Sequence, residues 1–241
     1  MSRIAILGYH KIGPPAPDGW ETWFYVPEAT FAEQLAALRD GGWQPVDLAA
    51  FLRGLVEPER LPERAALITF DDGYGSVREV ALPWLERFGY PAVVFVPTDF
   101  VGRTNRFDLE SEPEEPLCDW DDLRELVRRG VAVQSHGASH RAFSELSPAE
   151  RARELERSKA ALEAELEQTV GLFAYPYGDD AGAPPDVRQA LAQTGYLGAC
   201  LYGGGTLTIP PLDPYRLERL AMGPETDLTA ALEPGWSGIG S

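Results

Sequence analysis

The chain has 241 residues, 44% of them hydrophobic, which is enough for one large α/β domain or two small ones built around a core. Its formal net charge of -17 at pH 7 excludes nucleic acid as an expected partner, because like charges repel at long range. No stretch approaches the roughly 18 apolar residues of a membrane helix, so we expect no transmembrane segment.

Apolar runs rich in β-branched residues alternate along the chain with segments of helical periodicity. The predicted strands are residues 3–9, 65–70, 92–97, 131–135, 171–175, 196–201 and 215–222, with a short extra strand around residues 43–46. The predicted helices are residues 30–42, 48–56, 79–89, 119–130, 147–168 and 184–195. Strands that alternate with helices form a parallel sheet, because parallel neighbours need crossover connections.

About seven strand-and-helix repeats without a dividing linker favour a distorted (β/α) barrel, closed or partly closed, over a doubly wound open sheet. We expect the barrel domain to span residues 1–222, and residues 223–241, rich in glycine and proline, to form a peripheral C-terminal tail. Ser147 and Glu150 predict a capping box at the start of the longest helix, which we expect to be a solvated outer helix. The polar loop Val101–Cys118 is either a mobile rim or an insertion on the substrate side.

Polar motifs follow the predicted strands at the point where each strand ends. Asp71 and Asp72 follow the second strand in "TFDDG", His136 follows the fourth, and His10 follows the first. The turn "YPYG" follows the fifth strand. Because the carboxyl ends of the strands of a parallel barrel meet at one rim, we expect these residues to converge there.

The motif "SHGASH" predicts a metal site. Its His136 and His140 are four residues apart, so in a helical or turn conformation both imidazoles lie on one face and can bind one ion. Two histidines and one carboxylate leave a coordination position open, as in a catalytic divalent-metal site. Each motif alone is more often a turn or a packing contact, but their shared order at matching strand ends favours a metal-dependent active site.

At these residues the sequence resembles the polysaccharide deacetylases, the NodB-like carbohydrate esterase family 4. "TFDDG", "SHGASH" and "FAYPYG" are similar to the first three motifs of the family, and the resemblance spans roughly residues 3–222. It implies a distorted (β/α) barrel of about seven strands, in agreement with the strand count above.

The resemblance also implies roles for the motif residues. Asp71 would be the general base, and the backbone N–H of Tyr177 would stabilise the oxyanion. Asp72, His136 and His140 would bind Zn²⁺ or another divalent metal such as Co²⁺ or Ni²⁺.

Two departures from the family pattern stand out. Ala174 occupies the place of an arginine that orients the base, and no histidine follows His140 to serve as general acid. The stretch "GYHKI" before "TFDDG" resembles the poly-N-acetylglucosamine deacetylase branch, in which motifs are permuted along the chain, and this makes His10 the predicted acid, against a role in packing or tautomer support. Arg216 and Arg219 are the candidates for the missing arginine.

We therefore expect a metal-dependent carbohydrate N-deacetylase, a hydrolase of linear amide C–N bonds, acting on an N-acetylated sugar polymer or oligomer. The alternatives are an amidase of a small cyclic amide or an N-formyl sugar, and a non-catalytic carbohydrate-binding protein. Four aromatic residues either line a sugar groove or cover the barrel rim: Trp20, Trp23, Phe24 and Tyr25.

The expected compartment is the cytoplasm as the sequence stands, because "MSRIAILGYH" lacks a signal-peptide apolar region, whereas a removed leader would place the protein outside it. We expect Cys118 and Cys200 to be free thiols. The pattern leaves open the sugar, its chain length, the preferred metal and the oligomeric state.

Overall fold

A computed structural model of the protein describes residues 3–233. Its main sheet contains β1 (Arg3–Tyr9), β4 (Gln44–Pro45), β5 (Arg64–Phe70), β6 (Ala92–Val96), β7 (Val131–Ser135), β8 (Leu172–Ala174), β9 (Gly198–Cys200), β10 (Leu207–Thr208) and β11 (Leu220–Ala221), and a second sheet pairs β2 (Lys11–Ile12) with β3 (Tyr25–Val26). The helices are α1 (Glu28–Asp40), α2 (Leu48–Gly54), α3 (Leu82–Phe88), α4 (Trp120–Arg128), α5 (Pro148–Leu166), α6 (Pro185–Thr194) and α7 (Leu228–Ala231), and a π-helical turn at Val77–Ala81 precedes α3.

The parallel strands follow one another around a barrel in the order β1, β5, β6, β7, β8 and β9. The segment Leu217–Ala221 links the two ends of this row, because Leu217 pairs with Cys200 at the end of β9 and β11 pairs in parallel with β1. This arrangement confirms the predicted distorted (β/α) barrel. β10 was not predicted; its two residues pair antiparallel with the start of β1 and are too few to show a period in the sequence.

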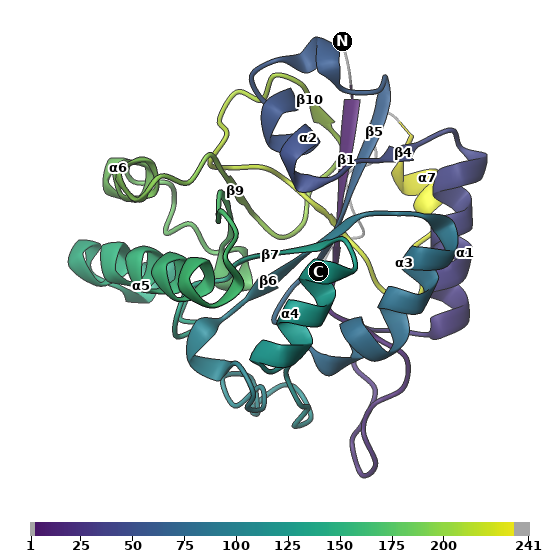
Figure 1. The fold of residues 1–241 in the computed structure, drawn as a ribbon, viewed down its shortest axis with the longest axis horizontal. Helices are drawn as coiled ribbons and strands as arrows, with labels where there is room; N and C mark the ends of the chain where they lie inside the picture. The colour runs from purple at the N-terminus through teal and green to yellow at the C-terminus, as the bar shows by residue number, and fades with distance from the viewer. Residues whose placement is uncertain (1–2, 234–241) are drawn as a thin grey trace.

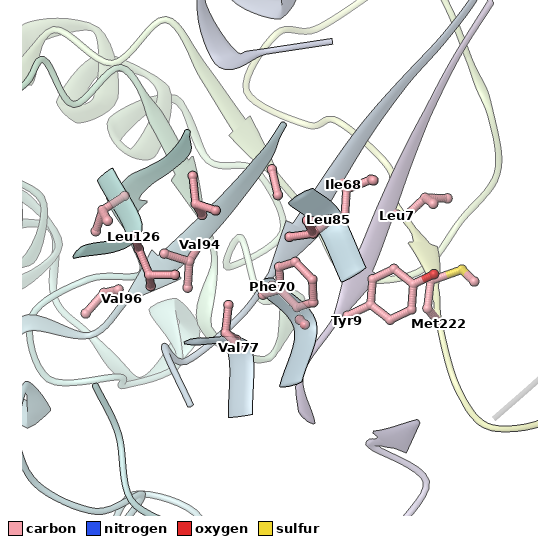
Figure 2. Close-up of a cluster of buried hydrophobic side chains, with 14 of the residues drawn as sticks. Leu7, Tyr9, Ile68, Phe70, Val77, Leu85, Val94, Val96, Leu126 and Met222 are labelled. Atoms are coloured by element: carbon pink, nitrogen blue, oxygen red, sulfur yellow. The ribbon is translucent and has the colours of Figure 1, made fainter. Parts of the chain in front are cut away.

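The side chains of each strand alternate between the barrel interior and the surrounding helices. In β1, Ile4 and Ile6 belong to the interior cluster, whereas Leu7 and Tyr9 belong to the layer between strands and helices. Figure 2 shows Leu7, Tyr9 and Phe70 of this layer side by side, and the Tyr9 and Phe70 rings stack with centroids 5.6 Å apart. The alternation directs every second side chain of β5 into the barrel, and Asp71 continues the interior row.

The helices form an outer layer around the strands. Figure 1 shows α5 and α6 together on the left of the barrel and α1 and α3 on the right. Ser147 and Glu150 form the predicted capping box of α5, since the Ser147 hydroxyl accepts a hydrogen bond from the Glu150 N–H and the Glu150 carboxylate accepts one from the Ser147 N–H. Within residues 3–233, none of the helices has the length and apolar character needed to cross a bilayer.

The first part of the predicted tail packs on the barrel domain. Leu228 and Ala231 of α7 are buried, and the Gln34 side chain of α1 donates hydrogen bonds to the carbonyl groups of Gly223 and Thr226. α7 lies against α1 in Figure 1. The rest of the predicted tail, residues 234–241, lies outside the described residues, so the division at residue 222 stays a prediction.

Candidate metal and active site

A cavity of about 220 Å³ opens at the carboxyl ends of the strands. It is lined by His10, Lys11, Phe24, Asp71, Asp72, Tyr74, Asp108, Ser111, Glu112, His136, His140, Tyr177, Gly178 and Tyr202. The fold thus brings together all six residues predicted for the site, which are separated by up to 167 positions in the sequence, from His10 to Tyr177.

Asp72, His136 and His140 form a buried triad with ligand atoms that lie within 4.8 Å of one another. Asp72 Oδ1 is 3.4 Å from His136 Nε2 and 3.0 Å from His140 Nε2, and it has no hydrogen-bond partner among residues 3–233. Burial by itself raises the pKa of Asp72, but the two imidazoles outweigh it and hold the pKa well below its usual range. A buried carboxylate oxygen and two imidazole nitrogens at this spacing fit a divalent cation.

The backbone of β8 orients the first imidazole. His136 Nδ1 lies 2.8 Å from the carbonyl oxygen of Ala174, to which an Nδ1–H donates. This bond leaves the Nε2 lone pair facing Asp72, as a metal ligand requires. Ala174, the residue at the family's arginine position, therefore helps to orient His136 through its backbone carbonyl group.

Glu154 of α5 shapes the loop between the two histidines. Its Oε2 accepts hydrogen bonds from the N–H groups of Ala138 (2.8 Å) and Ser139 (2.7 Å), and its Oε1 accepts one from the Ser139 hydroxyl (2.9 Å). At Gly137, where φ is +79°, a Cβ would come within 3.4 Å of the same carboxylate. α5 lies outside the strands, as expected, but the face that carries Glu154 is buried rather than solvated.

Arg219 occupies the position opposite the predicted base. Its Nη1 and Nη2 each lie 2.6 Å from one oxygen of Asp71, and its side chain is fully buried. Burial raises the pKa of Asp71, but Arg219 outweighs this and lowers it below the usual value. Of the two arginines considered from the sequence, Arg216 instead pairs with Asp180, 2.7 Å away.

His10 directly follows β1 and lies near both aspartates. Its Nε2 is 3.9 Å from Asp71 Oδ2 and 4.0 Å from Asp72 Oδ2. Its ring packs against Phe24 (centroids 4.5 Å apart) and Tyr202 (5.1 Å). Burial lowers the pKa of His10, and the two carboxylates partly oppose this shift.

The long loop Val101–Cys118 forms one wall of the cavity, which supports the substrate-side alternative. Asp108 Oδ1 accepts a hydrogen bond of 2.8 Å from the Tyr177 hydroxyl, and Glu112 forms a buried ion pair with Lys11. Of the four early aromatic residues, Phe24 lines the cavity, whereas Trp20 and Trp23 are exposed outside it. The hydroxyl of the fourth, Tyr25, donates to Glu115 instead.

Sequence reasoning missed several residues of the cavity wall. Tyr202 and Lys11 follow the ends of β9 and β1, so the rule that led to His10 also applies to them. No periodicity or motif marks Asp108 and Glu112, because they lie in an irregular loop. Cys118 and Cys200 are free, as predicted, and both are buried.

Residues 59–199, more than half of the chain, match the family model described as polysaccharide deacetylase. A Bacillus subtilis protein named as a polysaccharide deacetylase is 25% identical over 195 residues, covering 81% of this chain and 63% of the relative. The Escherichia coli poly-beta-1,6-N-acetyl-D-glucosamine N-deacetylase is 33% identical over 138 residues, covering 54% of this chain and 20% of the relative. The Streptococcus pyogenes deacetylase in complex with acetate superposes with a TM-score of 0.81 at 23% identity, covering 96% of this chain and 99% of that chain.

We predict that Glu154→Ala weakens divalent-cation binding about 10- to 100-fold, the usual effect of losing a group that supports a metal ligand. The change leaves the N–H groups of Ala138, which is buried, and Ser139, which is half-buried, without their acceptor, and the loop that spaces the histidines relaxes. Isothermal titration with the cation measures the effect.

Two variants of α5 serve as controls for this experiment. Glu154→Gln keeps an oxygen that can accept from both N–H groups, so its cation affinity should stay close to that of the wild type. Glu156→Ala, on the exposed face of α5, should also have the wild-type affinity. A folded Glu154→Ala protein with unchanged affinity would contradict the assignment.

Proposed function

Because this chain belongs to the polysaccharide deacetylase family, we propose that it is a metal-dependent carbohydrate N-deacetylase that removes N-acetyl groups from a sugar polymer or oligomer. The observation that carries the proposal is the arrangement of two adjacent carboxylates, one facing two imidazoles and the other paired with a buried arginine, in a single cavity. The name of the Escherichia coli relative supports an N-acetylated glucosamine polymer as the substrate class, although the match covers a fifth of that protein.

The triad Asp72, His136 and His140 would hold the metal, with Zn²⁺ proposed and Co²⁺ or Ni²⁺ as related choices. When bound, such an ion polarises the amide carbonyl and acidifies water. A donor set of one carboxylate and two imidazoles would leave coordination positions open for the substrate and for water.

Asp71 is the proposed general base. Arg219 keeps this carboxylate ionised and fixes its plane through two hydrogen bonds, so that it can accept the proton of the attacking water. The base and the metal ligand are neighbours in the chain, so their spacing is set by one peptide unit and does not depend on a flexible segment.

His10 is the proposed general acid, which transfers a proton from Nε2 to the nitrogen of the leaving amine. Its Nε2 lies within 4 Å of both carboxylates, and the rings of Phe24 and Tyr202 hold the imidazole on that side of the cavity.

The backbone N–H of Tyr177 is the proposed oxyanion donor. Tyr177 has φ +58° in the turn Pro176–Gly178, an uncommon conformation for a residue with a side chain, and its ring lies against His140 with centroids 4.7 Å apart. A left-handed residue at the rim of a metal site is consistent with a backbone shaped for a ligand.

A second candidate function is hydrolysis of a small cyclic amide or an N-formyl sugar. The cavity of about 220 Å³ is below the usual 300–1,000 Å³ of ligand pockets and favours a small substrate. A second, open cavity of about 590 Å³ shares His140 and Tyr177 with it and leaves room for a neighbouring sugar, which favours the polymer. The cytoplasmic location stays a prediction.

We predict that the metal-loaded protein releases acetate from N-acetylglucosamine oligomers and that Asp71→Asn reduces the rate at least about 100-fold, because the base is lost. Acetate assays measure the rate, and calorimetry should show nearly unchanged metal affinity in the variant. No acetate from protein that holds metal would exclude the deacetylase and favour the small amide.

His10→Ala should lower kcat about 100-fold and leave metal affinity within a few-fold of wild type, because the lost group protonates the leaving amine and binds no metal. Steady-state kinetics on the same oligomers provide the test. If the variant turned over at the wild-type rate, His10 would be a packing residue and not the acid.

Arg219→Gln should move the acidic limb of the kcat/KM profile to higher pH. Arg219 lowers the pKa of Asp71, so its removal lets the carboxylate protonate at higher pH, and the ionised base is then lost earlier as the pH falls. Arg216→Gln, which removes the pair with Asp180, should leave the limb in place. Equal profiles for the two folded variants would refute the role of Arg219.

A further inference from the structure

The two histidines of the triad are held in different ways. His136 Nδ1 has the Ala174 carbonyl oxygen as its partner, 2.8 Å away. His140 Nδ1 is buried and has no hydrogen-bond partner among residues 3–233. A metal-binding imidazole almost always has such a partner, which sets its ring orientation. Something other than a hydrogen bond must therefore orient His140.

The ring of Phe107 lies over His140. Their centroids are 3.9 Å apart and their planes make an angle of 31°, which is a close, tilted contact between the two rings. Tyr177 meets the same imidazole edge-on, with centroids 4.7 Å apart and an angle of 72°. The two aromatic rings restrict rotation of the His140 ring from two directions.

Phe107 belongs to the long loop Val101–Cys118, and this loop is anchored on both sides of it. Phe100 packs edge-to-face on Phe107 with centroids 4.9 Å apart. The buried Asn105 side chain donates to the Pro113 carbonyl and accepts from the Glu115 N–H, so it closes the loop on itself. At its end, the Cys118 N–H donates to the carbonyl of Gly73, next to the metal-binding Asp72.

Asp108, the next residue of the loop, forms a hydrogen bond with Tyr177, the second aromatic residue that contacts His140. Asp108 Oδ1 accepts the 2.8 Å hydrogen bond from the Tyr177 hydroxyl. Phe107 and Asp108 therefore act on His140 together, one by direct stacking and the other by holding Tyr177 against the imidazole edge. The same loop also supplies Ser111 and Glu112 to the cavity wall.

We propose that Phe107 is a positioning residue for the metal: its ring sets the orientation of the His140 imidazole in place of the hydrogen bond that His136 has. The inference rests on the proposed function only in taking the triad as a metal site. It makes the loop Val101–Cys118 a determinant of how tightly the ion is held, in addition to its role as a wall of the cavity. Without the Phe107 ring the His140 imidazole rotates, and its Nε2 no longer faces Asp72.

Divalent-cation affinity, measured by competition with a chelator, tests the proposal with Zn²⁺ as the probe. Phe107→Ala should weaken binding about 10- to 100-fold, the range for loss of a group that orients a ligand. Phe107→Tyr retains the ring over His140 and should therefore keep the affinity within about threefold of wild type.

Phe88→Ala is the matched control. Phe88 of α3 is also a half-buried aromatic residue, it packs on Tyr90 with centroids 5.4 Å apart, and it lines neither of the two cavities that contain His140. Its replacement should leave cation affinity unchanged.

A folded Phe107→Ala protein that binds Zn²⁺ as tightly as wild type would overturn the inference, and so would an equal loss in Phe88→Ala. The readout is independent of turnover, so a protein that shows the Phe107 effect but releases no acetate would contradict the proposed activity and leave this inference standing.

Discussion

The buried ion pair between Asp71 and Arg219 is the interaction on which the site depends. It joins the end of β5 to the segment that links β9 with β1, so it lies across the closure of the barrel. Burying two charges costs several kcal/mol per ion in proteins. The cost is offset here by two hydrogen bonds to Asp71 and by further ones from Arg219 to the Leu201 carbonyl and the Thr69 hydroxyl, so every oxygen and nitrogen of the pair faces a partner.

Two adjacent aspartates acquire different chemistry because they leave the strand in different directions. Asp71 continues the interior face of β5 and meets Arg219, whereas Asp72 turns to φ +68° and faces the two imidazoles. Both carboxylates have a lowered pKa and stay ionised. The partner of Asp71 is an arginine, which stays charged, whereas the partners of Asp72 are two histidines, which can also bind a metal. This difference is the physical basis for proposing Asp71 as the proton acceptor and Asp72 as the metal ligand.

Ring closure also accounts for the departures from the family pattern. β1 and the segment before β11 are distant in the sequence but neighbours in the barrel, so a histidine at the end of the first strand and an arginine near the last both reach Asp71. Ala174, where the family carries its arginine, is left to support His136 through its carbonyl oxygen. A side chain can thus move to another strand of a closed barrel and still act at the same point of the rim.

The sequence by itself determined the alternation of strands and helices, the barrel class and the residues of the three motifs, because strand and helix periods and the placement of polar groups at strand ends are local properties. It also indicated Arg219, but only as one of two candidates, since alternation along an irregular segment does not show which of Arg216 and Arg219 faces inward. The tertiary structure decided that choice through the pairing of Leu217 with Cys200, which directs Arg219 into the barrel. Only the fold could bring Phe107 onto His140 and Glu154 against the loop between the two histidines, because such contacts join positions with no shared period or motif.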